Sequence, residues 1–146
     1  MTPEKFCLQL LKNFPFEPTP SQDLWFRSIS EFIILNQHKS VFLLKGYAGT
    51  GKTTLIGSLV KQLKNTGYKA VLLAPTGRAS KVMSIYSDYP SFTIHKQIYY
   101  PKTENSGNTT FQLKPNKHNK TIFIVDEASM IGDQPKNGNL FDNMSL

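Results

Sequence analysis

The stretch GYAGTGKTT, residues 46–54, most narrowly limits what this chain can fold into. It fits G-x-x-x-x-G-K-[ST], a glycine-rich loop whose backbone N–H groups surround phosphate oxygens. The apolar segment VFLL precedes it and a helical pattern follows, the strand–loop–helix order in which such a loop works. An ordinary glycine turn is the alternative, but four matching positions in this context favour a nucleoside triphosphate site.

The residues of this loop have separate expected roles. Lys52 would reach the β- and γ-phosphates, and the Thr53 hydroxyl would bind Mg²⁺. The other positions expected to contact the nucleotide are Gly46, Ala48, Gly49, Thr50, Gly51 and Thr54.

The second functional signal is a pair of acidic residues that follows an apolar run in TIFIVDEASM, residues 121–130. Asp126 and Glu127 would stand at the carboxyl end of a strand, the edge of α/β sheets where ligands bind. Such a pair is commonly just a solvated turn. With the phosphate loop upstream, we interpret Asp126 as a Mg²⁺ ligand acting through water, and Glu127 as the base that orients and deprotonates attacking water.

Strand-like and helical patterns alternate along the chain. Helices are expected near residues 3–14, 20–35, 52–65 and 76–87 and briefly after residue 93, and buried strands at 41–45, 69–74 and 121–125, the last reached through a hairpin arm. In the second helix the expected buried stripe is Leu24, Trp25, Ile29, Phe32 and Ile33. The alternation predicts an α/β fold, with a parallel sheet flanked by helices and preceded by an N-terminal helical segment.

Composition limits the possible binding partners and cellular compartment of the protein. The net charge is +7, and between residues 32 and 125 thirteen Lys or Arg face only Asp88 and Glu104, which suits nucleic acid or simply a lysine-rich surface. No apolar run is long enough for a transmembrane helix, and no signal peptide is evident. The single cysteine, Cys7, excludes an internal disulfide, so we expect a reducing, cytoplasmic compartment. The three dispersed histidines (38, 95 and 118) predict no metal cluster.

Four motifs in this order, GYAGTGKTT, APTGRAS, FTIHK and VDEASM, resemble the first half of superfamily 1 DNA helicases of the RecD-like group. The loop alone is generic, whereas the set of four is highly specific. The resemblance implies a RecA-like P-loop ATPase lobe at residues 18–132, after a helix and connector (1–17) and before an irregular tail (133–146). It also implies ATP and Mg²⁺ as cofactors, single-stranded DNA as partner, and ATP-driven 5′→3′ translocation and unwinding by the full-length protein.

The resemblance assigns further residues. Gln22 in TPSQ matches an adenine-reading glutamine, although the stretch from Thr19 to Gln22 equally fits a helix capping box. APTGRAS and FTIHK match DNA-contacting motifs, whose expected contacts are Pro75, Thr76, Arg78, Lys81, Thr93, His95 and Lys96. A normal strand-to-helix junction and a structural histidine are the alternatives. Aromatic residues between 92 and 100 could stack on bases or belong to the core.

Two features of the resembled family are not found. Its second motor lobe supplies arginines to ATP, whereas Arg27 and Arg78 are the only arginines here. A later glycine–aspartate–x–x–glutamine strand, which lies between the phosphate-loop and acidic strands, is also lacking. We therefore expect a partial lobe with an incomplete sheet, either gapped at its centre or closed up, that binds nucleotide poorly and does not unwind DNA alone. The rivals are a nucleotide-gated DNA-binding fragment without turnover, and another P-loop enzyme such as a nucleotide kinase.

Overall fold

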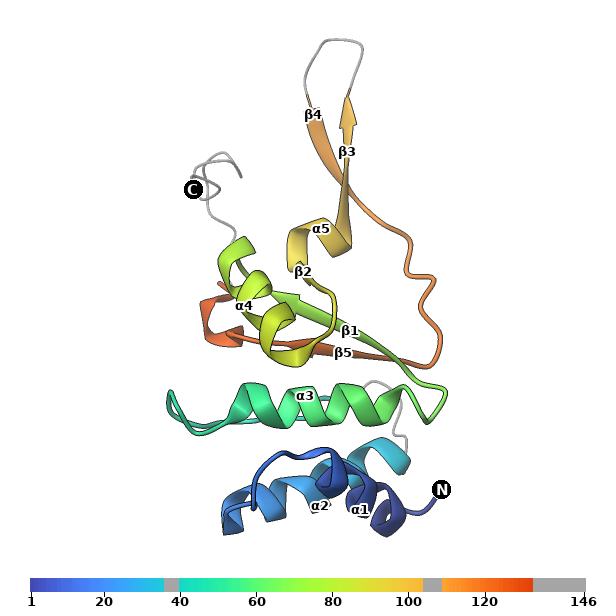
Figure 1. The fold of residues 1–146 in the computed structure, drawn as a ribbon. Coiled ribbons are helices and arrows are strands. Elements are labelled where there is room, and N and C mark those ends of the chain that lie inside the picture. The colour runs from blue at the N-terminus through green and yellow to red at the C-terminus, as the bar shows by residue number, and fades with distance from the viewer. Residues whose placement is uncertain (36–39, 104–108, 133–146) are drawn as a thin grey trace.

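A computed structural model describes residues 1–35, 40–103 and 109–132 (Figure 1). Its helices are α1 (Pro3–Asn13), α2 (Pro20–Ile34), α3 (Lys52–Leu63), α4 (Gly77–Ser87), α5 (Ile94–Ile98) and the 3₁₀ turn η1 (Ala128–Met130). Its strands are β1 (Lys69–Ala74), β2 (Ser91–Thr93), β3 (Tyr99–Thr103), β4 (Thr109–Leu113) and β5 (Thr121–Val125).

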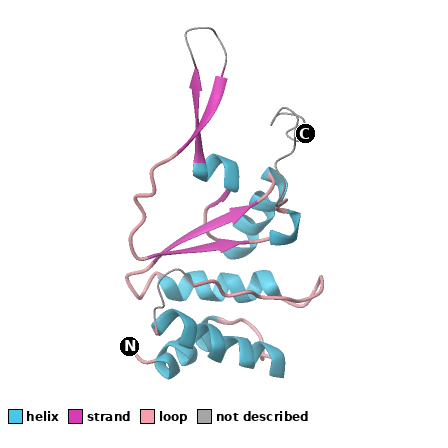
Figure 2. Cartoon of the chain, turned by 180° about the vertical axis from the view of Figure 1, so that it is seen from behind, coloured by secondary structure: helices cyan, strands magenta, loops and turns pink. Residues whose placement is uncertain are grey.

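The strands form two separate sheets. The order β2-β1-β5 is parallel throughout, with Leu72 opposite both Ser91 and Ile124. Strands β3 and β4 form an antiparallel hairpin that projects away from the rest of the molecule (Figures 1 and 2). The predicted α/β class, with a parallel sheet flanked by helices, is confirmed, as is the hairpin arm leading into β5.

Helix α3 lies between the α1–α2 pair and the three-stranded sheet (Figure 1). We call α1, α2 and α3 the helical layer. Its buried side chains are Phe6, Leu10, Phe14, Trp25, Phe26, Ile29, Ile33, Leu55, Leu59 and Leu63. A smaller cluster joins the other side of α3 to the sheet and α4: Ile56, Val60, Leu72 and Met83.

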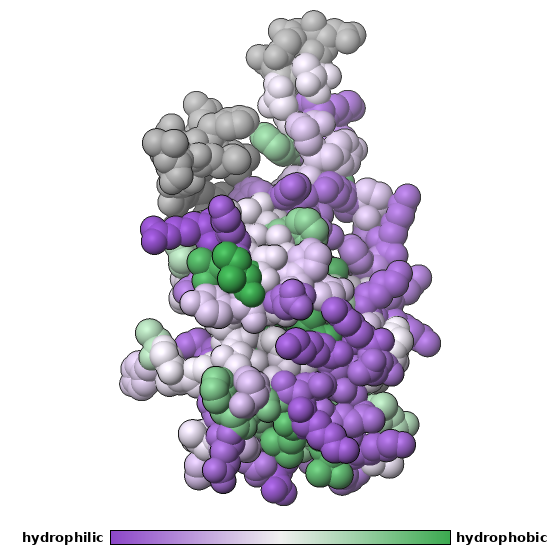
Figure 3. Space-filling view, in the orientation of Figure 1, coloured by the Kyte–Doolittle hydropathy of each residue, from purple (hydrophilic) through white to green (hydrophobic). Residues whose placement is uncertain are grey.

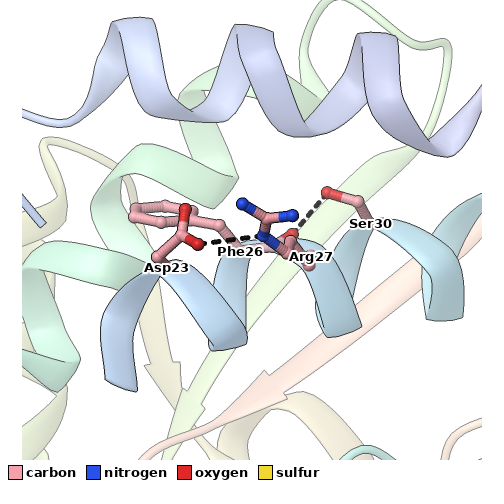
Figure 4. A network of polar contacts seen from close by, with 4 residues as sticks. All are labelled: Asp23, Phe26, Arg27 and Ser30. Atoms are coloured by element: carbon pink, nitrogen blue, oxygen red, sulfur yellow. Dashed lines mark hydrogen bonds and ion pairs between the residues drawn. The ribbon is translucent and has the colours of Figure 1, made fainter. Parts of the chain in front are cut away.

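The first two helices begin where their cap residues predict. The Thr2 hydroxyl accepts a hydrogen bond from the Lys5 amide, and Thr19 and Gln22 form a reciprocal capping box. In the middle of α2, Arg27 pairs with Asp23 at 2.9 Å and the Ser30 hydroxyl donates to the Phe26 carbonyl at 2.6 Å (Figure 4).

The predicted buried stripe of α2 was wrong at one position. Leu24 is exposed, and Phe26, which was not predicted, is fully buried. The reason is that α1 and α3 both pack on α2, so the buried surface is wider than one stripe and is rotated away from Leu24.

Polar side chains also join α1 to α3. Gln62 is 2% exposed, and its amide donates to Gln9 Oε1 at 2.6 Å and accepts from Asn13 Nδ2 at 3.3 Å. The Ser58 hydroxyl donates to the Asn13 carbonyl at 3.3 Å. This satisfied network fixes how the first helix sits on the third.

The predicted strand at residues 41–45 was wrong. Although its backbone is not helical, it pairs with no strand of the described chain. Phe42 and Leu44 pack against the helical layer, with the Phe42 ring 5.4 Å from that of Phe32, while Val41 and Leu43 are exposed. A strand requires a hydrogen-bonding neighbour, and within residues 1–35, 40–103 and 109–132 none lies beside this segment. The incomplete sheet was expected either to have a gap at its centre or to bring the phosphate-loop segment directly beside the strand of the acidic pair. The second form is not seen, because residues 41–45 do not pair with β5.

Strand β5 is half-buried on one face and exposed on the other, contrary to the predicted buried strand. Ile122 and Ile124 pack towards α3, whereas Phe123 and Val125 are 43% and 38% exposed. Successive side chains of a strand point to opposite faces, and no described helix covers the second face over β5.

The predicted tail, residues 133–146, lies outside the described residues. Across the parts that are described, none of the helices has the length and apolarity needed to cross a bilayer.

Candidate nucleotide-binding site

The loop before α3 depends on two glycines in the left-handed region. Gly49 has φ 78° and Gly51 φ 83°, conformations that side chains with a Cβ rarely adopt. Gly51 is also the residue that caps α3, so the loop enters the helix without a side-chain cap. The pattern predicted from the sequence thus corresponds to backbone geometry that glycine alone allows at low cost.

A third glycine leaves room inside the loop. A Cβ on Gly46 would lie 2.8 Å from Thr50 Oγ1. That hydroxyl donates to the Tyr47 carbonyl at 2.9 Å, and the Thr50 amide approaches the same carbonyl at 3.4 Å. Residues 46–50 therefore form a compact turn that a larger residue at 46 would distort.

The start of α3 offers unsatisfied donors. No other described residue accepts a hydrogen bond from the backbone N–H groups of Gly51, Lys52, Thr53 and Thr54. Consecutive free amides at the positive end of a twelve-residue helix match the negative oxygens of a phosphate. The loop thus fits the phosphate groups of a nucleotide.

Lys52 lies folded back on the loop. Its ammonium donates to the Gly46 carbonyl at 2.7 Å and to the Tyr47 carbonyl at 2.8 Å. The positive charge is therefore held beside the free amides, with these two carbonyls as its hydrogen-bond partners. The role of the Tyr47 carbonyl was not predicted, since every residue has such a backbone acceptor and its type does not reveal it.

Gln22 connects α2 to the loop. Its Oε1 accepts from the Thr19 amide at 3.0 Å, as the capping-box reading requires, and its Nε2 donates to the Thr50 carbonyl at 3.2 Å. A Cβ on Gly51 would lie 3.1 Å from the same Nε2. The capping box is confirmed, the bond to the loop was not predicted, and adenine recognition by Gln22 stays a prediction.

Asp126 and Glu127 follow β5, on the same side of the molecule as the phosphate loop (Figure 1). The Asp126 amide extends the ladder by donating to the Leu73 carbonyl at 2.9 Å. Its half-buried carboxylate accepts from the Glu127 amide at 3.0 Å, and Glu127 has φ 51° and an exposed side chain. In the described segments, neither carboxylate bonds or ion-pairs with the loop.

The expected Mg²⁺ donors are chemically suitable. The Thr53 hydroxyl makes no hydrogen bond with a described residue, and Asp126 keeps one carboxylate oxygen free. Hydroxyl and carboxylate oxygens are the ligands that Mg²⁺ prefers. No group of three His, Cys, Asp or Glu side chains within the described residues could hold a metal by itself, and His38 lies outside them.

The two predicted DNA-contacting motifs meet at one edge of the sheet. Ala74 pairs with Thr93, so the ends of β1 and β2 are neighbours. Thr76 caps α4 by accepting from the Ala79 amide at 3.2 Å, and Thr93 caps α5 by accepting from the Lys96 amide at 3.2 Å. Both threonines therefore act as helix caps, which is the alternative role to DNA contact.

The remaining predicted DNA contacts surround this edge. Pro75 is half-buried, whereas Arg78, Lys81, His95 and Lys96 are exposed. The Lys96 ammonium lies 5.8 Å from the Phe92 ring centre, and the His95 ring stacks obliquely 5.7 Å from Tyr99. The arrangement offers exposed cations next to partly exposed aromatic rings.

Known proteins resemble the chain over most of its length. The model of the AAA domain family matches residues 32–140. The ATP-dependent DNA helicase dda of Enterobacteria phage T4 is 33% identical over 99 residues, which cover 66% of this chain and 23% of that helicase. The ATP-dependent RecD2 DNA helicase of Deinococcus radiodurans is 31% identical over 91 residues, 62% of this chain and 12% of that protein.

A third relative, an uncharacterized protein of Acanthamoeba polyphaga mimivirus, is 30% identical over 139 residues, which cover 77% of this chain and 27% of the relative. The chain thus spans about a quarter or less of the length of these relatives. No solved structure matches it significantly.

These matches confirm the predicted resemblance to RecD-like superfamily 1 helicases. The family match runs through the phosphate loop, both threonine-capped motifs and the acidic pair. By this match and by its fold, the chain belongs to the AAA domain family.

Proposed function

We propose that this chain binds ATP with Mg²⁺ and is the nucleotide-binding lobe of an ATP-dependent DNA helicase. In the longer protein, ATP hydrolysis would drive 5′→3′ movement along single-stranded DNA and unwinding of duplexes. The observation that carries the proposal is the row of free amides at the start of α3 beside the Lys52 ammonium. The names of two relatives, both ATP-dependent DNA helicases, support it.

Each residue of the site has a role in this proposal. The loop positions Gly46, Ala48, Gly49, Thr50, Gly51 and Thr54 surround the phosphates. Lys52 exchanges the carbonyls of residues 46 and 47 for the β- and γ-phosphate oxygens, which gain a charged donor. Gln22 turns from the Thr50 carbonyl towards the adenine edge, where its amide can both donate and accept.

The catalytic roles fall to Lys52, Asp126 and Glu127. Thr53, and Asp126 through water, would hold Mg²⁺, which would supply positive charge to offset that of the transferring phosphoryl group. Glu127 orients the attacking water and accepts its proton. Glu127 suits this role because its carboxylate is exposed and no cation among the described residues pairs with it.

DNA would bind along the edge where β1 and β2 end. Pro75, Thr76 and Thr93 lie at the junctions, and the outer cations are Arg78, Lys81, His95 and Lys96. Lysine and arginine at such an edge neutralise phosphates and so give salt-dependent, sequence-independent affinity.

A second candidate is nucleotide-gated DNA binding without turnover by this chain alone. It is favoured by the unpaired segment 41–45, which carries the loop, and by the absence of a bond between the described acidic pair and the loop. A phosphate loop in this arrangement binds phosphate but does not hold the catalytic carboxylates in place.

The nucleotide site is tested by titrating the chain with a fluorescent ATP analogue in the presence of Mg²⁺. Lys52→Ala should weaken binding at least tenfold, because the charged donor to the phosphates is lost. Lys61→Ala is the matched control, an exposed lysine further along the same helix. Equal affinity in the Lys52 and Lys61 variants would refute the site.

Turnover separates the two candidates. Phosphate release is measured with and without single-stranded DNA, for the wild type and for Glu127→Gln. Hydrolysis that DNA stimulates and that Glu127→Gln abolishes supports an enzyme in this chain alone. Nucleotide-dependent DNA binding with no hydrolysis supports the second candidate, and phosphate transfer to a small-molecule acceptor would contradict both.

A further inference from the structure

Helix α4 is apolar on two opposite sides. Its inner side carries Met83, which is fully buried in the cluster with α3 and β1. Its outer side carries Val82, Ile85 and Tyr86, which are 45%, 70% and 71% exposed. The spacing i, i+3, i+4 places these three side chains in one row.

Such a row is unusual on the outside of a helix that covers a sheet, where polar residues normally face water. In Figure 3 the surface over α4 shows a green, hydrophobic patch bordered by purple, hydrophilic residues. Contiguous exposed apolar side chains with a polar rim are typical of an interaction surface.

The rim of this patch is basic. Arg78 and Lys81 are exposed on the same side of α4, one turn before Val82 and Ile85. Neither cation pairs with a carboxylate in the described parts of the chain. The helix contains no acidic residue, and Asp88, its C-cap, is the nearest acid in sequence.

The α3 side of the patch adds more positive charge. Gly57 of α3 lies under the end of α4, where a Cβ would be 3.5 Å from the Tyr86 carbonyl. One and two turns further along α3 are Lys61 and Lys64, and the Lys64 ammonium lies 5.1 Å from the Tyr89 ring centre. Lys64 thus adds a cation next to Tyr89, just after the end of α4.

Charge and size decide what can cover this surface. A second copy of a chain with net charge +7 would bring like charges together. Three side chains also supply only part of the roughly 800 Å² per partner that a stable dimer buries. A short segment with acidic and apolar side chains satisfies both conditions.

We propose that the α4 outer face, formed by Arg78, Lys81, Val82, Ile85 and Tyr86, docks a short acidic segment of another protein. Apolar side chains of that segment cover Ile85 and Tyr86, and its carboxylates pair with Arg78 and Lys81. Because those two cations are also proposed DNA contacts, the acidic segment and single-stranded DNA compete for this end of the chain.

The probe is a fluorescently labelled synthetic peptide in which Glu alternates with Leu and Phe, titrated with the full chain and read by anisotropy. The double variant Ile85→Ser, Tyr86→Ser should weaken binding at least tenfold, and Lys81→Glu should do the same. Raising the salt concentration should also weaken binding, because charge pairs at an exposed rim are screened. Leu8→Ser, an equally exposed leucine on α1, is the control and should change nothing.

Several results would overturn the proposal. They are no binding of the acidic peptide, equal binding of a peptide with Lys in place of Glu, and affinity that is unaffected by the double variant. Dimers that form with rising concentration and vanish in the double variant would assign the face to a second copy. A thymidine oligonucleotide that loses as much affinity as the peptide in the double variant would assign it to nucleic acid. Circular dichroism verifies that each variant is folded, which is expected because the replaced side chains are exposed.

Discussion

The helical layer and the three-stranded sheet are covered to very different extents. In the helical layer, Phe6, Leu10, Phe26 and Leu63 are completely buried between three helices. In the sheet, β5 buries one face against α3 and leaves Phe123 and Val125 partly exposed on the other. The difference indicates that the free energy of folding is concentrated in the helical layer. The phosphate loop enters that layer at the start of α3, whereas the acidic pair and the predicted DNA contacts lie at the less covered edge of the sheet.

The helical layer and the sheet also differ in how their polar groups are hydrogen-bonded. In the helical layer the buried amide of Gln62 bonds to the half-buried Gln9 and Asn13, and threonines cap the first two helices. Strand β5, by contrast, pairs only with β1, so its outer edge has no partner in the described chain. In the described residues, these bonds thus join helices of the helical layer, whereas the outer edge of β5 stays unpaired.

The sharpest test of this comparison uses one substitution in both regions. Phe26→Ala should lower the free energy of unfolding by about 3–5 kcal/mol, because it empties a fully buried site. Phe123→Ala should cost about 1 kcal/mol, because its ring is already partly in water. Urea unfolding with an unchanged slope measures both. Equal losses would show that the two regions are equally buried in solution.

A second pair compares glutamines. Gln62→Ala leaves the half-buried side chains of Gln9 and Asn13 without their partner, which should cost about 1–3 kcal/mol. Gln112→Ala removes an exposed bond from the Tyr100 hydroxyl and should stay within about 0.5 kcal/mol. Unfolding midpoints give both values. A larger loss for Gln112 would mean that the hairpin, not the helical layer, is the better-ordered part.

Helix caps give a third, smaller contrast. Thr19→Ala breaks the capping box of a fifteen-residue helix in the helical layer and should cost about 1 kcal/mol. Thr93→Ala uncaps the five-residue α5 at the sheet edge and should cost about 0.5 kcal/mol or less. The order of the two thermal midpoints tests this, and the reverse order would contradict it.

The smallest expected effect concerns Cys7, which is half-buried in the helical layer. Burial raises the pKa of its thiol above the ordinary value. Since the folded-state pKa is the higher one, the thiol's contribution to stability is complete below the ordinary pKa and is lost as pH rises through the folded value. The difference in unfolding free energy between the wild type and Cys7→Ala should therefore shrink at alkaline pH. A difference that does not change with pH would show that the thiol is solvated.

Local sequence signals predicted the helical layer well. Threonine caps followed by proline located the starts of α1 and α2, and apolar spacing identified Trp25, Ile29 and Ile33 as buried. The orientation of α2 was less predictable, since packing by two neighbours decided that Phe26 and not Leu24 is inside.

The sheet could be predicted only in part, because strand pairing depends on neighbours far away in sequence. An apolar run predicted both the segment 41–45 and β5, yet of these two only β5 pairs with a strand among the described residues. For the candidate site, the glycine pattern predicted the loop conformation at Gly49 and Gly51. The bond from Gln22 to the Thr50 carbonyl was beyond sequence analysis, because it joins a side chain to a backbone atom 28 residues away.

The burial of Trp25 has a practical consequence. It is the only tryptophan in the chain, it is 8% exposed, and its indole N–H has no hydrogen-bond partner in the described structure. An indole shielded from water emits blue-shifted light. Because the chain has one tryptophan, emission excited selectively over its six tyrosines reports on one position in the helical layer. Gln22, which touches the phosphate loop, stands one turn earlier on the same helix. The wavelength of the Trp25 emission therefore reports whether the helical layer next to the phosphate loop is folded.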